Sequence, residues 1–431
     1  MKKISKFFIG HKYMIVFYFV IVIAQFIGNG DSFPSDELTI SYTFHVVDFK
    51  LGIVSRVLPG QIYLLLFKNP SMKSFVIYEW FLMTIIFLIG SFLLEKLYLS
   101  ASERHKNAYA FIIVLFCISG VVFHMHFTFV GMFDVYWLYA SIVFLLLLQS
   151  KKLWFLIPLQ YVFMMFVNFG ALLNYIPLMS IILLYEASNA EKKEEKKHLL
   201  IVFFISVAFT IATFAVLSYN ETNNLHYSRE QLHEILKSRG TTFYVYYDSY
   251  LYDDTIFRFL GKETVFRNVV FLKSEAIPAF IRSFINTIVT QFDKIIEVYF
   301  RTKVLESNTD YVLRIVACVL SGVPALIFFN RCYRRLFKST KDKLKRFAVF
   351  CAIMLFPFAF FASVMFSTDV TRFYSNSFIC TFVCFLYLLY KEKYTVGNIL
   401  YGLCVKSDKS LLLLYFVISF ISRFCPFTGV K

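Results

Sequence analysis

The feature that most constrains this sequence is a series of long apolar segments, which recurs from Met14 to Ile421. A helix needs about 20 predominantly apolar residues to cross the hydrocarbon core of a bilayer. Eleven segments are predicted to span, at residues 13–28, 74–94, 109–124, 135–149, 153–167, 170–187, 199–218, 311–329, 347–366, 373–390 and 410–424. The sequence therefore predicts an all-α fold, a polytopic integral membrane bundle that forms one transmembrane domain over residues 1–431.

The composition excludes a water-soluble enzyme. Hydrophobic residues make up 58% of the chain and charged residues only 17%, against about a quarter charged in soluble domains. The net charge of +16 would suggest nucleic acid in a soluble protein. Here the basic residues cluster at the ends of apolar segments, so the predicted partner is the lipid bilayer and no nucleic acid is expected.

The basic clusters also predict a topology. They lie at residues 2–12, 96–106, 151–152, 192–197 and 331–346, all on one side of the predicted spans. Cytoplasmic loops carry an excess of Lys and Arg, so we predict a multi-pass protein of the bacterial cytoplasmic (inner) membrane with a cytoplasmic N-terminus. The outer side then holds a first outer loop at 29–73 and a large outer loop at 219–310.

Both outer loops contain elements that are predicted not to span. Residues 56–67 suit a re-entrant or interfacial segment, because the apolar run is short and contains a Pro-Gly pair. Ser228 and Gln231 form a capping box, which predicts a short helix at 229–239. Residues 277–301 have an apolar stripe opposite a polar one, which predicts an amphipathic interfacial helix.

The cysteines and the known sequence fingerprints indicate no cofactor. The eight cysteines lie in or near apolar spans or in basic loops, so neither a disulfide framework nor a metal site is predicted. No Walker loop, dinucleotide fingerprint, HExxH or GxSxG pattern is present in the sequence.

Ionisable residues on the outer side are the candidate functional residues, because charge near hydrocarbon is costly. The first outer loop offers candidates for a carboxylate base beside a cation that holds an anionic leaving group: Asp31, Asp36, His45, Asp48 and Arg56. Asp48 and Asp36 are the catalytic candidates there, and the others are substrate-binding candidates. The alternative is a solvated loop with paired charges.

Further candidates lie at the outer ends of later spans. Asp134 is a third catalytic candidate, or an N-cap carboxylate on the helix dipole. Arg372 either pairs with Asp369 or grips a diphosphate with its planar guanidinium. Asn168 lies in a turn at membrane depth, where it either caps a helix or lines a wet cavity. Glu79 lies among aromatic residues and is expected at the membrane interface.

A tyrosine- and aspartate-rich stretch, residues 243–259, lies in the large outer loop. Tyr247 and Asp253 are its substrate-binding candidates, since tyrosine rings stack on sugars and carboxylates accept hydroxyl hydrogen bonds. The alternative is a loop whose rings anchor it to lipid headgroups.

The layout resembles bacterial membrane proteins of surface-polysaccharide assembly, namely lipid-linked-sugar glycosyltransferases of the GT-C type and O-antigen or capsule repeat-unit polymerases. The resemblance rests on many Phe-rich spans, one large later outer loop and an acidic first outer loop that contains DFKLGIVSRVLPG (Asp48, Gly52, Arg56, Gly60). It implies that an outer-loop carboxylate, Asp48, Asp31 or Asp36, serves as base or substrate ligand. It also implies that Arg56 and Arg372 hold the polyprenyl diphosphate.

The resulting hypothesis is an enzyme, a polymerase or glycosyltransferase that acts on undecaprenyl-diphosphate-linked oligosaccharide at the outer face of the membrane. Its setting is O-antigen (lipopolysaccharide) or capsule biosynthesis, with other polysaccharide-assembly membrane proteins as candidate partners. It needs no metal or other cofactor if the lipid diphosphate is itself the leaving group. Two alternatives stay open: a flippase or transporter of lipid-linked glycan, and a non-catalytic scaffold of a glycan-assembly complex.

Overall fold

The computed structural model describes residues 10–26, 41–119, 132–241, 309–366, 370–406 and 413–418. All regular elements in these segments are helical, which confirms the predicted all-α class. The α-helices of ten or more described residues are α2 (Lys12–Phe26), α4 (Val57–Leu66), α5 (Met72–Ser100), α6 (Lys106–Ile118), α8 (Asp134–Leu148), α9 (Ile157–Val167), α10 (Tyr175–Asn189), α11 (Lys193–Asn223), α12 (Arg229–Ser238), α16 (Thr309–Ser339), α17 (Lys343–Phe366), α18 (Val370–Lys391) and α19 (Thr395–Lys406). Four 3-10 helices join them: η1 (Phe49–Leu51), η2 (Glu103–His105), η3 (Lys151–Leu156) and η4 (Phe169–Leu173).

Four of the described helices, α5, α11, α17 and α18, are long and apolar enough to cross a membrane. Each predicted span coincides at least in part with described helical residues, but for several spans fewer helical residues are described than a bilayer crossing needs. The number of crossings therefore stays a prediction. The pattern of spans does not predict α19, because its 12 residues are too few to cross. The predicted interfacial helix at 277–301 lies outside the described residues.

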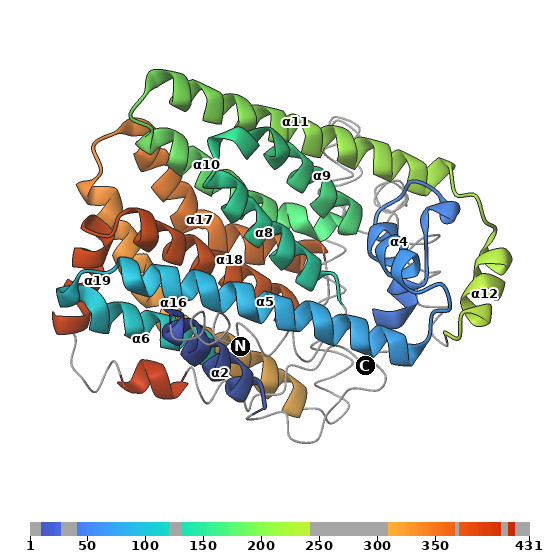
Figure 1. Cartoon of the computed structure of the whole chain (residues 1–431), viewed down its shortest axis with the longest axis horizontal. Coiled ribbons are helices and arrows are strands. Elements are labelled where there is room, and N and C mark those ends of the chain that lie inside the picture. The colour runs from blue at the N-terminus through green and yellow to red at the C-terminus, as the bar shows by residue number, and fades with distance from the viewer. Residues whose placement is uncertain are drawn as a thin grey trace, which may run out of the picture.

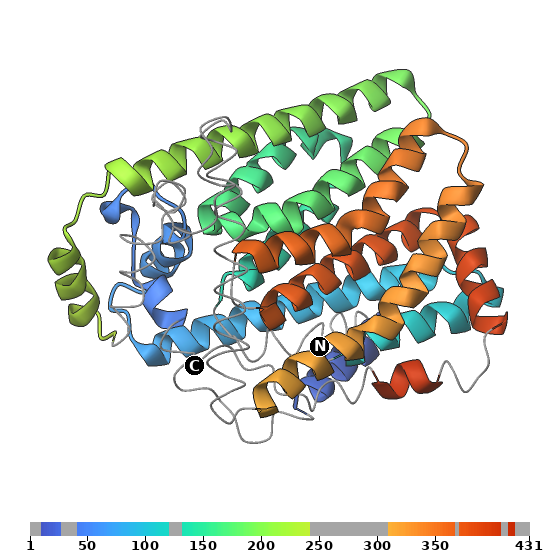
Figure 2. The ribbon, with the colours of Figure 1, turned by 180° about the vertical axis from the view of Figure 1, so that it is seen from behind.

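The long helices run along a common direction, so the bundle has two ends (Figure 1). We call one the loop end; there α5 and α8 begin, and α4 and α12 lie beside them. We call the other the basic end; there α5 finishes, α11 begins and α19 lies, as the view from behind also shows (Figure 2). The lysine-rich connections before α9, α11 and α17 are at the basic end. This gathering agrees with the one-sided clusters in the sequence, and the side of the membrane that each end faces stays a prediction.

Local sequence signals explain where several helices begin. Ser71 and Ser74 form a reciprocal capping box at the start of α5, and Ser228 and Gln231 form another at the start of α12. Each box satisfies backbone N–H groups that have no partner within the helix. Pro158 lies in the first turn of α9, where its missing N–H costs nothing.

Aromatic side chains form much of the core. The ring of Phe329 on α16 lies 4.5–6.3 Å from three rings of α18, those of Phe378, Phe382 and Phe385. These separations suit offset or edge-on aromatic pairs. α17 packs between α10 and α18, while α11 packs against α9 and α10. On its other face α11 exposes large apolar residues such as Phe204 and Ile211, as a lipid-facing helix requires.

Candidate functional site

Asp48, the first catalytic candidate, is held between a 3-10 helix and α12. Its side chain accepts a hydrogen bond from the backbone N–H of Lys50 at 3.1 Å and caps η1. Arg239, just after α12, places its Nη2 3.3 Å from Asp48 Oδ2 and donates from Nη1 to the carbonyl of Val46. Tyr42 donates to the carbonyl of Arg239 at 2.8 Å. The Asp48 side chain keeps 13% of its surface exposed, so it is paired but not sealed off.

The structure explains why two positions of the DFKLGIVSRVLPG motif are glycine. Gly52 has a φ of +139°, a backbone conformation that side chains rarely adopt. A Cβ at Gly60 would lie 1.8 Å from the carbonyl oxygen of Val47, so α4 rests directly on the backbone that leads to Asp48. Both glycines therefore help to fix the position of Asp48.

Arg56, a substrate-binding candidate, begins α4 from a left-handed backbone conformation with φ 70°. A residue with a side chain at positive φ is strained, and such strain often marks functional sites. The backbone N–H of Arg56 donates to Phe166 O at 3.0 Å. Beside it, Glu221 at the end of α11 accepts from the N–H and the hydroxyl of Ser55, at 3.0 and 2.6 Å. The Arg56 side chain is close enough to that carboxyl group to interact with it electrostatically.

Asp134 and Arg372, predicted separately, meet inside the bundle. Arg372 of α18 donates from Nε to Asp134 Oδ2 at 2.6 Å, and Asn376 donates to Asp134 Oδ1 at 2.6 Å. Tyr175 of α10 donates to Asn376 Oδ1 at 3.1 Å. The side chains of Asp134 and Arg372 are 5% and 13% exposed. Phe133 holds the N-cap position of α8, so Asp134 is not the N-cap, but Asp134 lies in the first turn, where a carboxylate interacts favourably with the helix dipole.

A tight turn between α9 and α10 lies against α8, the helix that carries Asp134. Asn168 accepts from the N–H of Gly170 at 2.7 Å and so caps η4, as one of its two predicted roles requires. Gly170 lies against Trp137, since a Cβ there would be 2.8 Å from the indole ring. Trp137 also contacts Tyr175, with ring centroids 5.7 Å apart. Its buried indole N–H has no hydrogen-bond partner among the described residues, which is the kind of group that a polar ligand or water satisfies.

His45 is buried in a separate polar cluster. Its Nδ1 lies 2.8 Å from Ser41 O, and its Nε2 lies 2.6 Å from the Tyr136 hydroxyl and 3.3 Å from Glu79 Oε1. Burial lowers the pKa of His45 to about 4, so the ring is neutral at neutral pH. Both ring nitrogens are thus engaged with protein groups. The Glu79 side chain is 0% exposed, so it faces the protein interior, and its depth relative to the membrane interface stays a prediction.

Four candidates lie outside the described residues: Asp31, Asp36, Tyr247 and Asp253. Asp369, the predicted partner of Arg372, does so too. Sequence reasoning did not single out Glu221, Asn376 or Tyr175. A polar residue within an apolar segment is the signal that would have found Asn376. In the described part of the chain, no cluster of His, Cys, Asp or Glu could hold a metal ion.

Comparison with known proteins gives one distant structural similarity. No protein-family model and no curated protein matches the sequence. The chain is similar in structure to the archaeal oligosaccharyltransferase AglB from Archaeoglobus fulgidus, solved with an inhibitory peptide and a dolichol-phosphate. The identity is 14% and the TM-score 0.40, over 96% of this chain and 55% of that one. This chain spans about half the length of that enzyme, and a similarity of this size assigns it no activity.

Proposed function

We propose that this membrane protein transfers glycosyl units from a polyprenyl-diphosphate-linked oligosaccharide at the loop end of its bundle. The setting that we propose is O-antigen or capsule assembly, at the outer face of the bacterial cytoplasmic membrane. One observation supports this most: two carboxylate–arginine pairs, Asp134 with Arg372 and Asp48 with Arg239, lie at the same end of the bundle. A glycosyl transfer that releases a diphosphate needs both kinds of group.

The reaction forms a bond from the anomeric carbon to an acceptor hydroxyl oxygen and breaks the bond from that carbon to the diphosphate. The hydroxyl proton passes to a carboxylate, and the lipid diphosphate leaves with the bonding electron pair. Arginine guanidinium groups match phosphate oxygens with paired donors and stabilise this leaving group. The protein thus needs a base that is open to substrate and arginines that face the diphosphate.

Asp48 is the better base of the two paired aspartates. It has one arginine contact, at 3.3 Å, and a partly exposed side chain. Asp134 accepts two hydrogen bonds of 2.6 Å and is nearly buried. We therefore assign proton acceptance to Asp48 and the positioning of Arg372 to Asp134. Arg372 and Arg56 are the proposed ligands of the diphosphate.

The first test uses the native host. The gene is deleted, the strain is complemented from a plasmid, and the surface polysaccharide is separated on a gel. Collapse of the ladder to a single repeat unit supports a polymerase. Loss of all units would favour a flippase or an earlier transferase, and an unchanged ladder would remove the polysaccharide assignment.

Variants then test the assigned residues. Asp48→Asn keeps the size of the side chain and removes the base, so ladder synthesis should fall at least about 100-fold with unchanged protein level. Arg372→Gln should have a similar effect through loss of diphosphate binding, and this is compared at equal amounts of folded protein, because the substitution also removes one member of the buried pair with Asp134. Glu103→Gln is the matched control, because this carboxylate belongs to an exposed pair with Lys106 at the basic end. Full ladders from both Asp48→Asn and Arg372→Gln would refute the site.

Purified protein in liposomes separates the remaining alternatives. An enzyme lengthens a polyprenyl-diphosphate-linked glycan, and Asp48→Asn abolishes the lengthening. A flippase moves the lipid-linked glycan between leaflets without lengthening it, and a scaffold does neither. Either of the last two outcomes would contradict the proposal.

A further inference from the structure

An elongated apolar cavity of about 410 Å³ lies inside the bundle. Its walls come from α2, α5, α6, α8 and α18, and they consist mainly of Leu, Ile, Phe and Val side chains. On α8 the lining residues extend from Leu138 to Gln149, a length of about 16 Å along the helix axis. The cavity is therefore long enough for a stretch of hydrocarbon chain, and its apolar wall offers little to hold ordered water.

The polar residues of the lining are concentrated at the basic end. Lys96, Gln149 and Lys391 line the cavity there, together with Tyr387 and Tyr390. Tyr390 is 39% exposed and the Lys391 side chain 37%, so this end reaches the surface of the protein. Ser141 lines the cavity further in, where its hydroxyl donates to the Trp137 carbonyl of its own helix at 2.9 Å.

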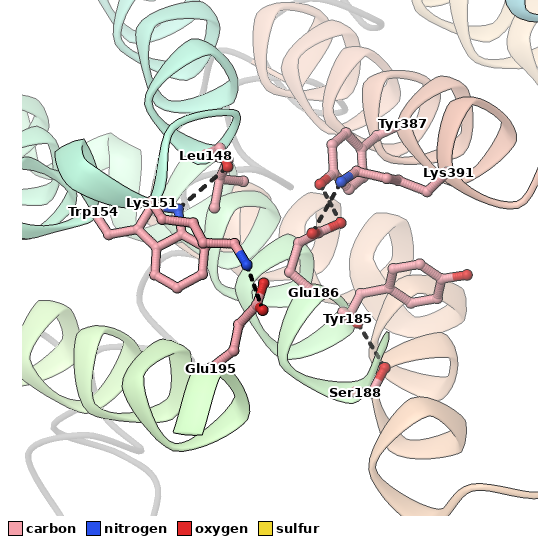
Figure 3. Close-up of polar contacts among 9 residues, drawn as sticks. All are labelled: Leu148, Lys151, Trp154, Tyr185, Glu186, Ser188, Glu195, Tyr387 and Lys391. Carbon is pink, nitrogen blue, oxygen red and sulfur yellow. Dashed lines mark hydrogen bonds and ion pairs between the residues drawn. The ribbon is translucent and has the colours of Figure 1, made fainter. Parts of the chain in front are cut away.

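The charge at this rim is positive on balance. Lys391 lies 3.0 Å from Glu186 Oε2, and the Tyr387 hydroxyl donates to Glu186 Oε1 at 2.5 Å (Figure 3). Lys96 adds a second cation, with its Nζ 4.6 Å from the centroid of the Phe92 ring. One carboxylate thus accompanies two ammonium groups, and an anionic group at the rim would restore neutrality.

The inner end of the cavity lies beneath the polar cluster of the loop end. Leu138 follows Asp134 by one helical turn, and Ile379 follows Asn376 by nearly one turn. The helices α8 and α18 that position Asp134 and Arg372 are therefore also walls of the cavity.

We propose that this cavity binds an acyl chain of an anionic glycerophospholipid, with the lipid phosphate between Lys96 and Lys391. A polar headgroup at the surface and an apolar chain along the bundle axis match the two parts of the cavity. Membrane leaflets rich in anionic lipid attract basic residues at their surface, and the one-sided basic clusters of this chain fit that surface. The proposal does not depend on glycosyl transfer.

The first experiment measures lipid binding to the purified full-length protein. Native mass spectrometry follows a titration with dioleoyl phosphatidylglycerol, and a parallel one with dioleoyl phosphatidylcholine, which has the same chains and no net charge. We expect one tightly bound phosphatidylglycerol and about a tenfold preference over phosphatidylcholine. Equal binding of the two lipids, or displacement of phosphatidylglycerol by inorganic phosphate, would overturn the proposal.

Gly90→Leu tests the apolar part of the site. A Cβ at Gly90 would meet no atom within 4 Å, and Gly90 lines the cavity, so leucine fills the space without a backbone clash. Lipid binding should fall at least about tenfold, while the midpoint of thermal denaturation should not fall, because leucine favours the helix more than glycine does. Gly402→Leu on α19 is the matched control, since a Cβ there also meets no atom within 4 Å. Wild-type lipid binding by Gly90→Leu would refute the cavity as the site.

The double variant Lys96→Gln, Lys391→Gln tests the headgroup. We expect it to bind phosphatidylglycerol about as weakly as phosphatidylcholine. Lys106→Gln, at a partly exposed lysine of the same end that pairs with Glu103, should leave the preference unchanged. A double variant that still prefers phosphatidylglycerol tenfold would overturn the assignment of the two lysines.

Discussion

One ion pair at the loop end and two at the basic end differ strongly in burial. At the loop end, Asp134 and Arg372 pair with side chains only 5% and 13% exposed. At the basic end, the pair of Lys106 and Glu103 has exposures of 28% and 87%, and that of Lys151 and Glu195 has exposures of 66% and 23%. An exposed pair adds little stability, and a buried one pays a desolvation penalty that can exceed its attraction. The buried pair is thus poorly explained by stability alone, which supports a functional role.

The largest expected effect is the removal of one partner from the buried pair. Asp134→Ala leaves the Arg372 charge in place without its carboxylate, which should destabilise the protein by about 3–5 kcal/mol. A denaturant titration in detergent micelles measures this loss. The double variant Asp134→Asn, Arg372→Gln should recover a large part of it, because no charge is then left buried. A double variant no more stable than Asp134→Ala would show that the pair itself holds α8 and α18 together.

The pair of Asp134 and Arg372 illustrates which features the sequence predicts and which it does not. Most helices were predictable because apolar runs and capping boxes are local signals. Asp134 and Arg372 were each predictable as candidates, since both are charged residues at the ends of spans. Their contact was not, because it joins positions 238 residues apart and depends on how α8 packs near α18.

Two further residues show the same limit at the loop end. Glu79 was expected at the interface because its neighbours are aromatic, yet the segment that carries His45 covers it. Arg239 was predictable only as the end of a short helix, and its contact with Asp48 is equally non-local. Local pattern therefore predicted the elements, and tertiary packing decided the partners.

The next effect concerns pH and the buried histidine of the loop end. Burial lowers the pKa of His45 to about 4 from an ordinary value of 6.5. Between these values the His45 side chain of the unfolded chain takes up a proton that the folded protein excludes, so the contribution of His45 to stability falls as the pH is lowered from about 6.5 to about 4. The loss should approach about 3 kcal/mol. Denaturant titrations across this range measure it.

His45→Asn provides the control for this dependence. The amide does not titrate, so the variant should be less stable than the wild type at pH 7 but should lose less stability on acidification. An identical pH slope in wild type and variant would assign the dependence to other groups of the protein.

A smaller effect is expected from substitution of Gly60, where α4 packs against the backbone of Val47. Gly60→Ala places a methyl group where the Val47 carbonyl oxygen lies, 1.8 Å away, so the helix must shift. We expect a loss of about 1–3 kcal/mol and a larger loss of ladder synthesis, because the backbone leading to Asp48 moves with it. Gly402→Ala is the matched control in an open position. Normal activity of Gly60→Ala would show that the position of Asp48 does not depend on how α4 packs against Val47.

The smallest effect is expected at the basic end, at the exposed ion pair of Lys151 and Glu195. Lys151→Gln breaks the 2.6 Å contact with Glu195 (Figure 3), but both side chains reach solvent and can be hydrated separately. The free energy of unfolding should change by no more than about 0.5 kcal/mol, and ladder synthesis should stay at the wild-type level. The difference in stability loss between Lys151→Gln and Asp134→Ala then reflects the difference in burial of the two ion pairs, since both substitutions remove one member of a pair. A loss of several kcal/mol from Lys151→Gln would instead show that an exposed ion pair contributes as much to stability as the buried one. The burial of Asp134 and Arg372 would then no longer support a functional role for that pair.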